Sequence, residues 1–292
     1  MQTYMHKSAV LLGAKNDAKL TSDIDKIIHL ETNLAKALHD HPLNLLRMGS
    51  FSGLNNATHN RIDWVDVINS LLTATGSKLA HFKESDTVLS QNMDYLNAAA
   101  TVLDETPEEV VQNLFGWFIV HVFNSLTTKA ARENYNVFQE AISGIPRHPS
   151  TPDYCFMLAN SRLAWATGRI YVDSHFTPED KKEATTLVNE IRSAFRSTLQ
   201  SNTWLDQTTK QLALEKLEAI VANVGYPDWV LDNSVIDSIY EHLKGLNVTK
   251  GKFFEAAVEL NVRTVRHQFD TMHSPLNHTL NVPMTPSTVN AA

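Results

Sequence analysis

The sequence predicts a mainly α-helical protein, and three observations support this fold class. Apolar residues recur at spacings of three and four, the period of an α-helix, along most of the 292 residues. Capping residues precede several of these stripes, where a side-chain oxygen can accept a hydrogen bond from a free amide of the first helical turn. Alternating runs rich in β-branched residues are almost absent, and no Asn-Gly or Asp-Gly hairpin pair occurs.

Two helix starts are predicted in the first half of the chain. Ser22, followed by Asp25, opens a stretch that should end before Pro42. A second start is Thr106-Pro107-Glu108-Glu109, which combines a capping residue, proline at the first helical position and a carboxylate at the third. The apolar stripe of the first helix consists of Ile24, Ile27, Ile28, Leu34 and Leu38.

Three more helices are predicted in the second half, and we expect their apolar stripes to face a core. Thr177-Pro178-Glu179-Asp180 repeats the start pattern, and Asp206 caps a further helix that Gly225 and Pro227 stop. The stripes are Leu187, Ile191, Phe195 and Leu199; Leu214, Leu217 and Val221; and Phe254, Val258, Val262 and Val265. From Ser274 onward the chain is polar and interrupted by prolines, and we expect at most a short extended edge there.

Composition and charge exclude several classes of protein. Apolar residues make up 43% and charged residues 20% of the chain, which is typical of a globular protein. A net charge of −7 without a basic run excludes a nucleic-acid backbone as partner. The longest apolar run, 114–120, is too short for a bilayer, which needs roughly 20 apolar residues. No signal-peptide pattern occurs in residues 1–20, so we expect no membrane segment in this chain.

The cysteine and the glycosylation sequons point to different compartments. Cys155 is the only cysteine, which is typical of a cytosolic protein with a buried thiol. Three Asn-x-Thr sequons, typical of secreted proteins, favour the opposite interpretation. Their candidate glycosylation sites are Asn56, Asn247 and Asn277.

The histidines do not have the spacing of a metal site. Thermolysin-like zinc peptidases place H-E-x-x-H on one helix, so that both imidazoles reach the zinc ion and the glutamate activates water. No such motif occurs: after His29-Leu30-Glu31 the second position is Asn33. His39 and His41 stand at a helix end, and the remaining candidates are widely spaced, namely His267, His273 and His278. We therefore predict no metal ligand.

No catalytic motif of another class occurs either. The chain has no G-x-S-x-G elbow, no phosphate-binding glycine loop and no dinucleotide fingerprint. A nucleophilic Cys155 would need a histidine close in space, and only proximity in sequence suggests His148 or His175. Composition and spacing alone predict no catalytic residue.

An ordered set of motifs, strongest over residues 144–240, resembles the neprilysin and endothelin-converting-enzyme family of zinc metallopeptidases. The later motifs match the family's W-x-D-x-x-T-K, E-K and I-G-Y-P-D/E runs, and 31–35 is similar to its E-x-x-L-A helix. Trp204 and Tyr226 within these motifs are expected to be packing residues. The matching segments are Pro152-Asp153-Tyr154-Cys155, Ala166-Thr167-Gly168-Arg169-Ile170-Tyr171-Val172, Phe176, Thr203-Trp204-Leu205-Asp206, Thr209-Lys210, Glu215-Lys216 and Val224-Gly225-Tyr226-Pro227-Asp228.

The resemblance implies a two-lobed parent protein of which this chain is one part. It implies that 1–273 form the helical cap lobe, partial at its N-terminus, and that 274–292 begin the segment leading to the catalytic lobe. That lobe, with H-E-x-x-H and a further glutamate ligand, is missing from these residues. Zinc is therefore expected in the full-length family but not in this chain.

Two further positions acquire roles from the resemblance. Thr288-Val289-Asn290-Ala291-Ala292 is similar to the family's V-N-A-Y/F-Y stretch, with Ala292 in place of an aromatic residue. By that match Asn290 and Ala291 bind the substrate backbone by β-augmentation. Cys155 would have a disulfide partner in the absent lobe, as expected of an odd cysteine in a secreted-type fold.

Three functional hypotheses follow. The first is a partial zinc metalloendopeptidase whose parent cleaves peptides and which is inactive alone. The second is a non-catalytic protein of the same fold that binds peptides or a partner. The third, an unrelated helical scaffold, would require the motif match to be accidental. The resemblance also implies an extracellular or plasma-membrane ectodomain, and an exposed lobe interface that could drive self-association.

Overall fold

The computed structural model describes residues 1–42, 46–146, 149–275, 280 and 284–286. Within these residues the chain forms thirteen α-helices and one two-stranded antiparallel sheet, so the mainly α prediction is confirmed. Contacts divide the chain into two compact units. Unit 1 comprises Met1–His148 and Gly245–His273, and unit 2 comprises Pro149–Lys244 and Ser274–Ala292. The domain boundary that the sequence analysis places between residues 273 and 274 stays a prediction.

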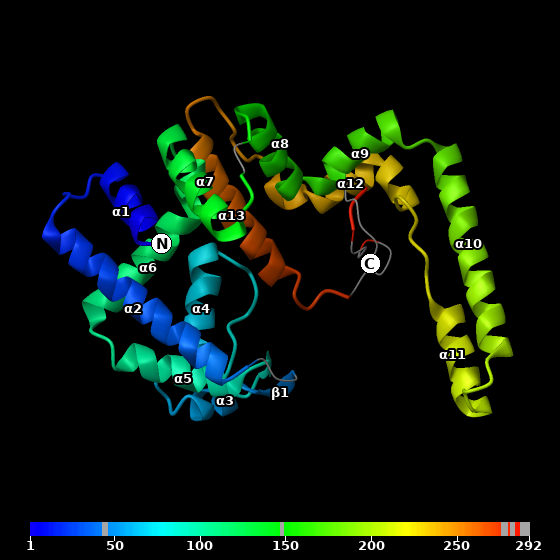
Figure 1. Cartoon of the computed structure of the whole chain (residues 1–292), viewed down its shortest axis with the longest axis horizontal. Coiled ribbons are helices and arrows are strands. Elements are labelled where there is room, and N and C mark those ends of the chain that lie inside the picture. The colour runs from blue at the N-terminus through cyan, green and yellow to red at the C-terminus, as the bar shows by residue number, and fades with distance from the viewer. Residues whose placement is uncertain (43–45, 147–148, 276–279, 281–283, 287–292) are drawn as a thin grey trace. The chain divides into compact units, whose positions relative to one another are not determined.

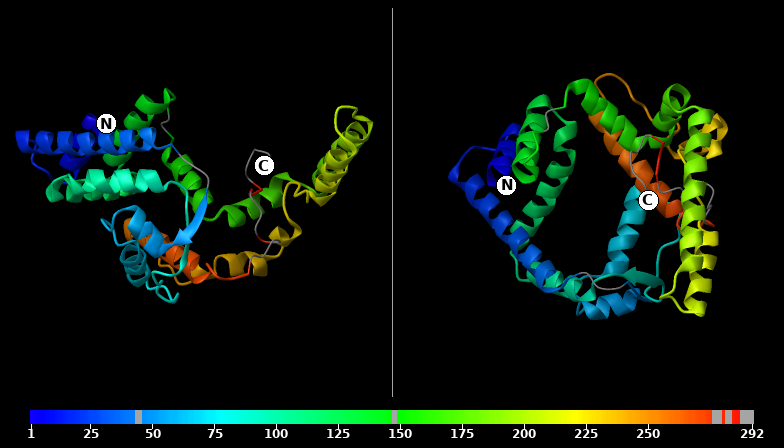
Figure 2. Two further views of the ribbon diagram at one scale, coloured as in Figure 1. Left: turned by 90° about the horizontal axis from the view of Figure 1, so that it is seen from below. Right: turned by 45° about the vertical axis from the view of Figure 1, so that its right-hand side comes forward.

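Unit 1 contains eight α-helices among the residues described, and the two short strands. The strands pair with Met48 opposite Leu89. In Figures 1 and 2, α2 runs beside α5 and α6. The elements are α1 (Gln2–Leu11), α2 (Ala18–Asp40), β1 (Arg47–Ser50), α3 (Phe51–Ala57), α4 (Trp64–Thr75), β2 (Thr87–Ser90), α5 (Met93–Asp104), α6 (Glu108–Phe123), the 3₁₀ turn η1 (Asn124–Leu126), α7 (Lys129–Ser143) and α13 (Phe253–Asp270).

The main core of unit 1 lies between α1, α2, α6 and α7. One face of α6 contributes Leu114 and Trp117, which pack with Tyr4 of α1 and Phe138 of α7. The Tyr4 ring stacks on Phe138 at a centroid distance of 4.5 Å and meets Trp117 edge-on at 5.2 Å. Aromatic pairs in these geometries add to the gain from apolar burial.

A buried polar network fixes α1 on this core. Asn124 donates from its amide to the Tyr4 hydroxyl at 3.3 Å and to the Ser8 hydroxyl at 3.1 Å. Asn134 donates to Ser8 Oγ and to the Tyr4 carbonyl, each at 3.0 Å. Burial raises the pKa of the Tyr4 phenol above its ordinary value. Because these groups satisfy one another, α1 can bury polar atoms without leaving them unpaired.

The last helix of unit 1 returns to α4 and closes its C-terminal end. Arg266 on α13 donates to the Thr75 carbonyl, and Asp270 accepts from the Ser77 hydroxyl at 2.6 Å and the Lys78 amide at 2.8 Å. These bonds hold the pKa of the Asp270 carboxyl below its ordinary value. Gly76 adopts φ +67°, the left-handed conformation that ends many helices.

Unit 2 has a much smaller core. Its buried cluster contains three residues, Val172, Tyr226 and Val230, with Trp165 and Trp229 packed at its edge. Figure 1 shows the long α10 beside α11. The elements are α8 (Thr151–Arg162), α9 (Ala164–His175), α10 (Pro178–Ser201), α11 (Gln207–Ala219), η2 (Asp228–Leu231), α12 (Asn233–Ile239) and η3 (Glu241–Leu243).

The helix starts agree with the sequence in two cases and differ in two. Thr177 forms a full capping box with Asp180, and Asp206 caps α11 as predicted. The start predicted at Ser22 is wrong, because Asp17, five residues earlier, accepts a hydrogen bond from the Leu20 amide and caps α2. Thr106 does not cap α6, because its hydroxyl instead donates to the Val102 carbonyl at the end of α5.

The end predicted for α11 is also wrong. The helix stops at Ala219, so Val221 lies beyond it and Gly225 does not terminate it. Neither four-residue strand was expected, since β1 and β2 are too short to show an alternating pattern. Among the described residues of the tail, Ser274–Pro275, Leu280 and Met284–Pro286, no strand is found.

The prediction that all apolar stripes face a core fails for α10. Leu199 is buried, but Leu187, Ile191 and Phe195 are exposed by 58%, 60% and 51%. The residues of α10 that bond α11 are instead Arg192 and Arg196, which lie outside this stripe. Helical periodicity therefore identified an apolar face on α10 that the described residues leave uncovered.

We expect the Leu114→Ala variant to lower the free energy of unfolding by about 2–5 kcal/mol, because it leaves a cavity among packed side chains. Leu114 is 1% exposed, whereas Ile119 on the same helix is 63% exposed. The matched Ile119→Ala variant should cost about 0.5 kcal/mol or less. Urea unfolding followed by circular dichroism measures both, and similar losses in the two variants would contradict this core assignment.

Candidate functional site

In the part of the chain that the structure describes, no three His, Cys, Asp or Glu side chains lie close enough together to hold a metal ion. Asn290 and Ala291, the predicted substrate-binding residues, lie outside the described residues, as does Asn277. The candidate features are therefore the motif residues, the surfaces and the groove among the residues that the structure describes.

The Trp-x-Asp-x-x-Thr-Lys motif forms the joint between α10 and α11. Asp206 accepts hydrogen bonds from the Thr209 amide at 2.9 Å and the Thr209 hydroxyl at 2.6 Å. These bonds hold the pKa of the Asp206 carboxyl below its ordinary value. Lys210 donates to the carbonyls of Gln200 and Asn202, where α10 ends. The motif thus caps one helix and satisfies the end of the preceding one.

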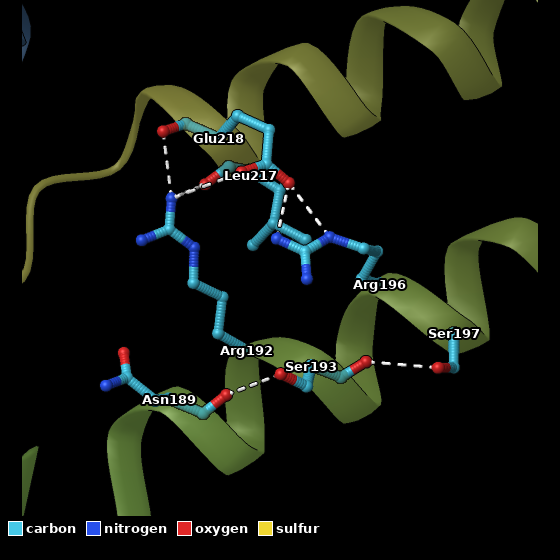
Figure 3. Close-up of polar contacts among 7 residues, drawn as sticks. All are labelled: Asn189, Arg192, Ser193, Arg196, Ser197, Leu217 and Glu218. Carbon is cyan, nitrogen blue, oxygen red and sulfur yellow. Dashed lines mark hydrogen bonds and ion pairs between the residues drawn. The ribbon is translucent and has the colours of Figure 1, made fainter. Parts of the chain in front are cut away.

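Two arginines of α10 close the other end of α11, as Figure 3 shows. Arg192 donates to the carbonyls of Leu217 and Glu218 at 2.7 and 2.8 Å. Arg196 donates through two nitrogens to one carboxylate oxygen of Glu218. A guanidinium at a helix C-terminus meets free carbonyls and the negative end of the helix dipole. This clamp explains why α11 ends at Ala219 rather than near Gly225.

The Gly-Tyr-Pro-Asp motif lies in the loop after α11 and attaches this loop to the start of α10. Gly225 has φ +69°, and a Cβ there would lie 2.5 Å from Cε1 of Phe176, so only glycine fits. Tyr226 is buried, as predicted for a packing residue. Lys181 donates to the Tyr226 carbonyl at 2.7 Å and to Asp228 at 2.6 Å, and its ammonium lies 4.3 Å from the Tyr226 ring centroid.

Other motif residues lie at the surface. Trp204 is 79% exposed, so its predicted packing role is wrong within the described residues. Cys155 is exposed on α8, which contradicts a buried thiol and leaves it accessible for pairing. Asn56 and Asn247 are both exposed, as glycan acceptors must be. Glu31 of the E-x-x-L-A segment is half-buried, and burial raises its carboxyl pKa.

Unit 2 has an extensive apolar surface. Besides the α10 stripe, α8 has no buried residue among its twelve, and Phe156 and Ile170 are exposed on α8 and α9. Exposed apolar surface of this extent is typical of a surface that contacts a protein, a ligand or a membrane.

Unit 1 carries a groove of about 1310 Å³ along α2, α5 and the start of α6. Its floor includes Leu30 and Val102, and charges of both signs, such as Asp25 and Lys36, line its rim. Sequence reasoning missed this groove, because its walls come from helices more than 50 residues apart. The charges and hydrogen-bonding side chains that line this groove do not indicate one class of ligand.

In the part of the chain that the structure describes, no helix is both long and apolar enough to cross a membrane.

Comparisons with known proteins agree on one relationship. Residues 1–227 match the family model described as Peptidase family M13. The chain is 28% identical to Neprilysin-1 of Trittame loki and 25% identical to an endothelin-converting enzyme homolog of Locusta migratoria, covering 99% of this chain and 40% of each relative. The fold matches the cryo-EM structure of the Mycobacterium tuberculosis zinc metalloprotease ZMP1 in its open state, with a TM-score of 0.73 at 22% identity over 99% of this chain and 43% of that one. The chain thus spans about two fifths of the length of these relatives.

We expect the cap at Asp206 to make stability depend on pH. Its folded pKa lies below the ordinary value of 3.8, so its stabilising effect is present above that pH and is lost as pH falls through the lowered pKa. The Asp206→Ser variant keeps a cap that does not titrate. Thermal unfolding between pH 6 and about pH 2 should show wild type losing stability relative to Asp206→Ser on acidification. A difference between the two proteins that stays constant with pH would contradict this role.

Proposed function

The chain belongs to peptidase family M13, and on that premise we propose that it is the helical, non-catalytic part of a zinc metalloendopeptidase that cleaves peptides. The observation that carries this proposal is the match to the family model over residues 1–227, which includes the capping, clamp and Gly-Tyr-Pro motifs. The fold likeness over 99% of the chain supports the assignment of fold.

Zinc does not fit the donors of the described residues. The 292 residues contain no H-E-x-x-H, and the described part brings no three potential ligands together. We therefore propose that this chain carries out no zinc-dependent step and is inactive alone. Its own contribution would be to bind the backbone of a peptide through Asn290 and Ala291, as a strand added to the substrate.

The first test measures hydrolysis and binding separately. With equimolar zinc, the purified chain should not cleave a fluorogenic peptide, and chelator-sensitive turnover would contradict the proposal. A fluorescent peptide should still bind, and Asn290→Ala should weaken its binding about fivefold, the equivalent of one hydrogen bond. Asn247→Ala, at an exposed asparagine of unit 1, is the matched control and should bind as wild type does.

The apolar surface of unit 2 suggests a second role for this chain. We propose that Leu187, Ile191 and Phe195 pack against the part of the longer protein that corresponds to the uncovered three fifths of the relatives. Without that part, two copies of the chain can bury their stripes against each other. This removes apolar surface from water, so the isolated chain should self-associate.

Sedimentation velocity tests this role. Under reducing conditions Ile191→Lys should shift the chain toward monomer, whereas Asn189→Lys, at an exposed position on another face of α10, should not. Oxidation should add a covalent dimer that Cys155→Ser abolishes. A wild-type chain that stays monomeric at all concentrations would contradict the exposed interface and favour a stand-alone peptide-binding protein.

Exposure of Asn56 and Asn247 supports an extracellular or ectodomain location for the protein. When the chain is expressed with a secretory leader, glycosidase treatment should increase its gel mobility. Asn247→Gln should remove the mobility shift of one glycan. Asn233→Gln, at an asparagine outside any sequon, should leave the mobility shift unchanged. A secreted chain that carries no glycan would contradict both acceptor assignments.

A further inference from the structure

The two long helices of unit 2, α10 and α11, are bonded to each other at two places. Near the turn between them, Lys210 of α11 donates to the Asn202 carbonyl at 2.8 Å. Near the end of α11, Arg192 of α10 donates to the carbonyls of Leu217 and Glu218 at 2.7 and 2.8 Å. Because both ends of α11 are bonded to α10 or to its last turn, we expect the two helices to move as one body.

Among the described residues, a single side chain makes the polar contacts between these helices and the rest of unit 2. The hairpin arm, residues 177–220, comprises α10 and α11 with their capping residues. Within the part of unit 2 that the structure describes, α10 and α11 pack extensively only on each other. The hydrogen bonds that leave the arm both come from Lys181, which donates to the Tyr226 carbonyl at 2.7 Å and to the Asp228 carboxylate at 2.6 Å.

The partners of Lys181 belong to the core of unit 2. Tyr226 packs with Val172 and Val230 in the buried cluster, so its carbonyl is a fixed point. The Lys181 ammonium also lies 4.3 Å from the centroid of the Tyr226 ring, a cation–π contact. Asp228 is 95% exposed, so its ion pair with Lys181 contributes little, and the contacts with Tyr226 attach the arm.

The covalent connections of the arm to the core are short non-helical segments. Before α10 the backbone of Phe176 and Thr177 is extended. After α11, residues 220–224 form neither helix nor strand, and Val221 among them is 80% exposed. Hinge motions concentrate in a few residues at the ends of helices and in loops, where φ and ψ can change without breaking a packed core.

We propose that the hairpin arm is a hinged element and that Lys181 is the latch that fixes its direction. The arm turns as one body about residues 176–177 and 220–225, and the contacts of Lys181 with Tyr226 hold it against the core. The exposed stripe of α10 belongs to the arm, so the latch determines which way this stripe faces relative to α9 and α12. The latch acts whether or not the stripe packs against another part of a longer protein.

Distances between pairs of spin labels, measured by pulsed electron paramagnetic resonance, test this proposal. In a Cys155→Ser background, labels at Ser197→Cys and Ser238→Cys report the distance between the arm and α12, which packs on η2 beside the buried cluster. Labels at Thr186→Cys and Gln211→Cys report a distance within the arm. All four labelled positions are exposed, so the labels should not disturb the core.

The Lys181→Met variant keeps the apolar part of the side chain and removes its charge and its donors. Ser197 lies about 24 Å along α10 from Lys181, so a turn of about 10° displaces it by about 4 Å. We expect Lys181→Met to broaden the arm-to-α12 distances by at least about 4 Å and to leave the distance within the arm unchanged. Lys182→Met, at the exposed neighbouring lysine, is the matched control and should leave both distributions as in wild type.

Three outcomes would overturn the proposal. If Lys181→Met leaves the arm-to-α12 distances as narrow as in wild type, or if Lys182→Met broadens them equally, Lys181 is not the latch. If the wild-type distances are already as broad as those of Lys181→Met, no latch holds the arm. If Lys181→Met also broadens the distance within the arm, the two helices do not move as one body.

Discussion

Burial of one face of α6 against α1, α2 and α7 is the interaction on which unit 1 depends. Leu114 and Trp117 supply its apolar centre, and Tyr4 joins that centre to the polar network of Asn124 and Ser8. Because apolar burial is the dominant favourable term in folding, a helix covered on this scale can hold its neighbours in place. The chain has no second core of comparable size among its described residues.

Unit 2 is instead held by hydrogen bonds at the ends of its helices. Asp206, Lys210 and Arg192 satisfy free amides and carbonyls at the end of α10 and at both ends of α11, yet one apolar stripe of α10 stays exposed. An exposed charged pair or a cap each contributes about 1 kcal/mol or less in the typical case, whereas large apolar faces contribute more once they are covered. The proposed role as one part of a longer peptidase accounts for both features, and the relative from Trittame loki has about two and a half times this length.

Local features were predictable from the sequence, and features that depend on distant neighbours were not. Thr177 and Asp206 cap their helices as predicted, because a cap needs only the next three residues. Thr106 fails as a cap because its hydroxyl bonds the preceding helix, and α11 ends early because Arg192 reaches it from α10. The bonds of Lys181 to the loop after α11 join residues far apart in the chain, so the Gly-Tyr-Pro-Asp motif in that loop gave no sign of them.

Amide hydrogen exchange over the whole chain tests the central claim, that unit 1 carries its own core and unit 2 needs a covering polypeptide. Exchange of buried, hydrogen-bonded amides reports the free energy of local opening. The amides of α2 and α6 should exchange slowest, and those of α8 and the middle of α10 at least about tenfold faster. Equal protection of α8, α10 and α6 in a monomeric sample would contradict the claim.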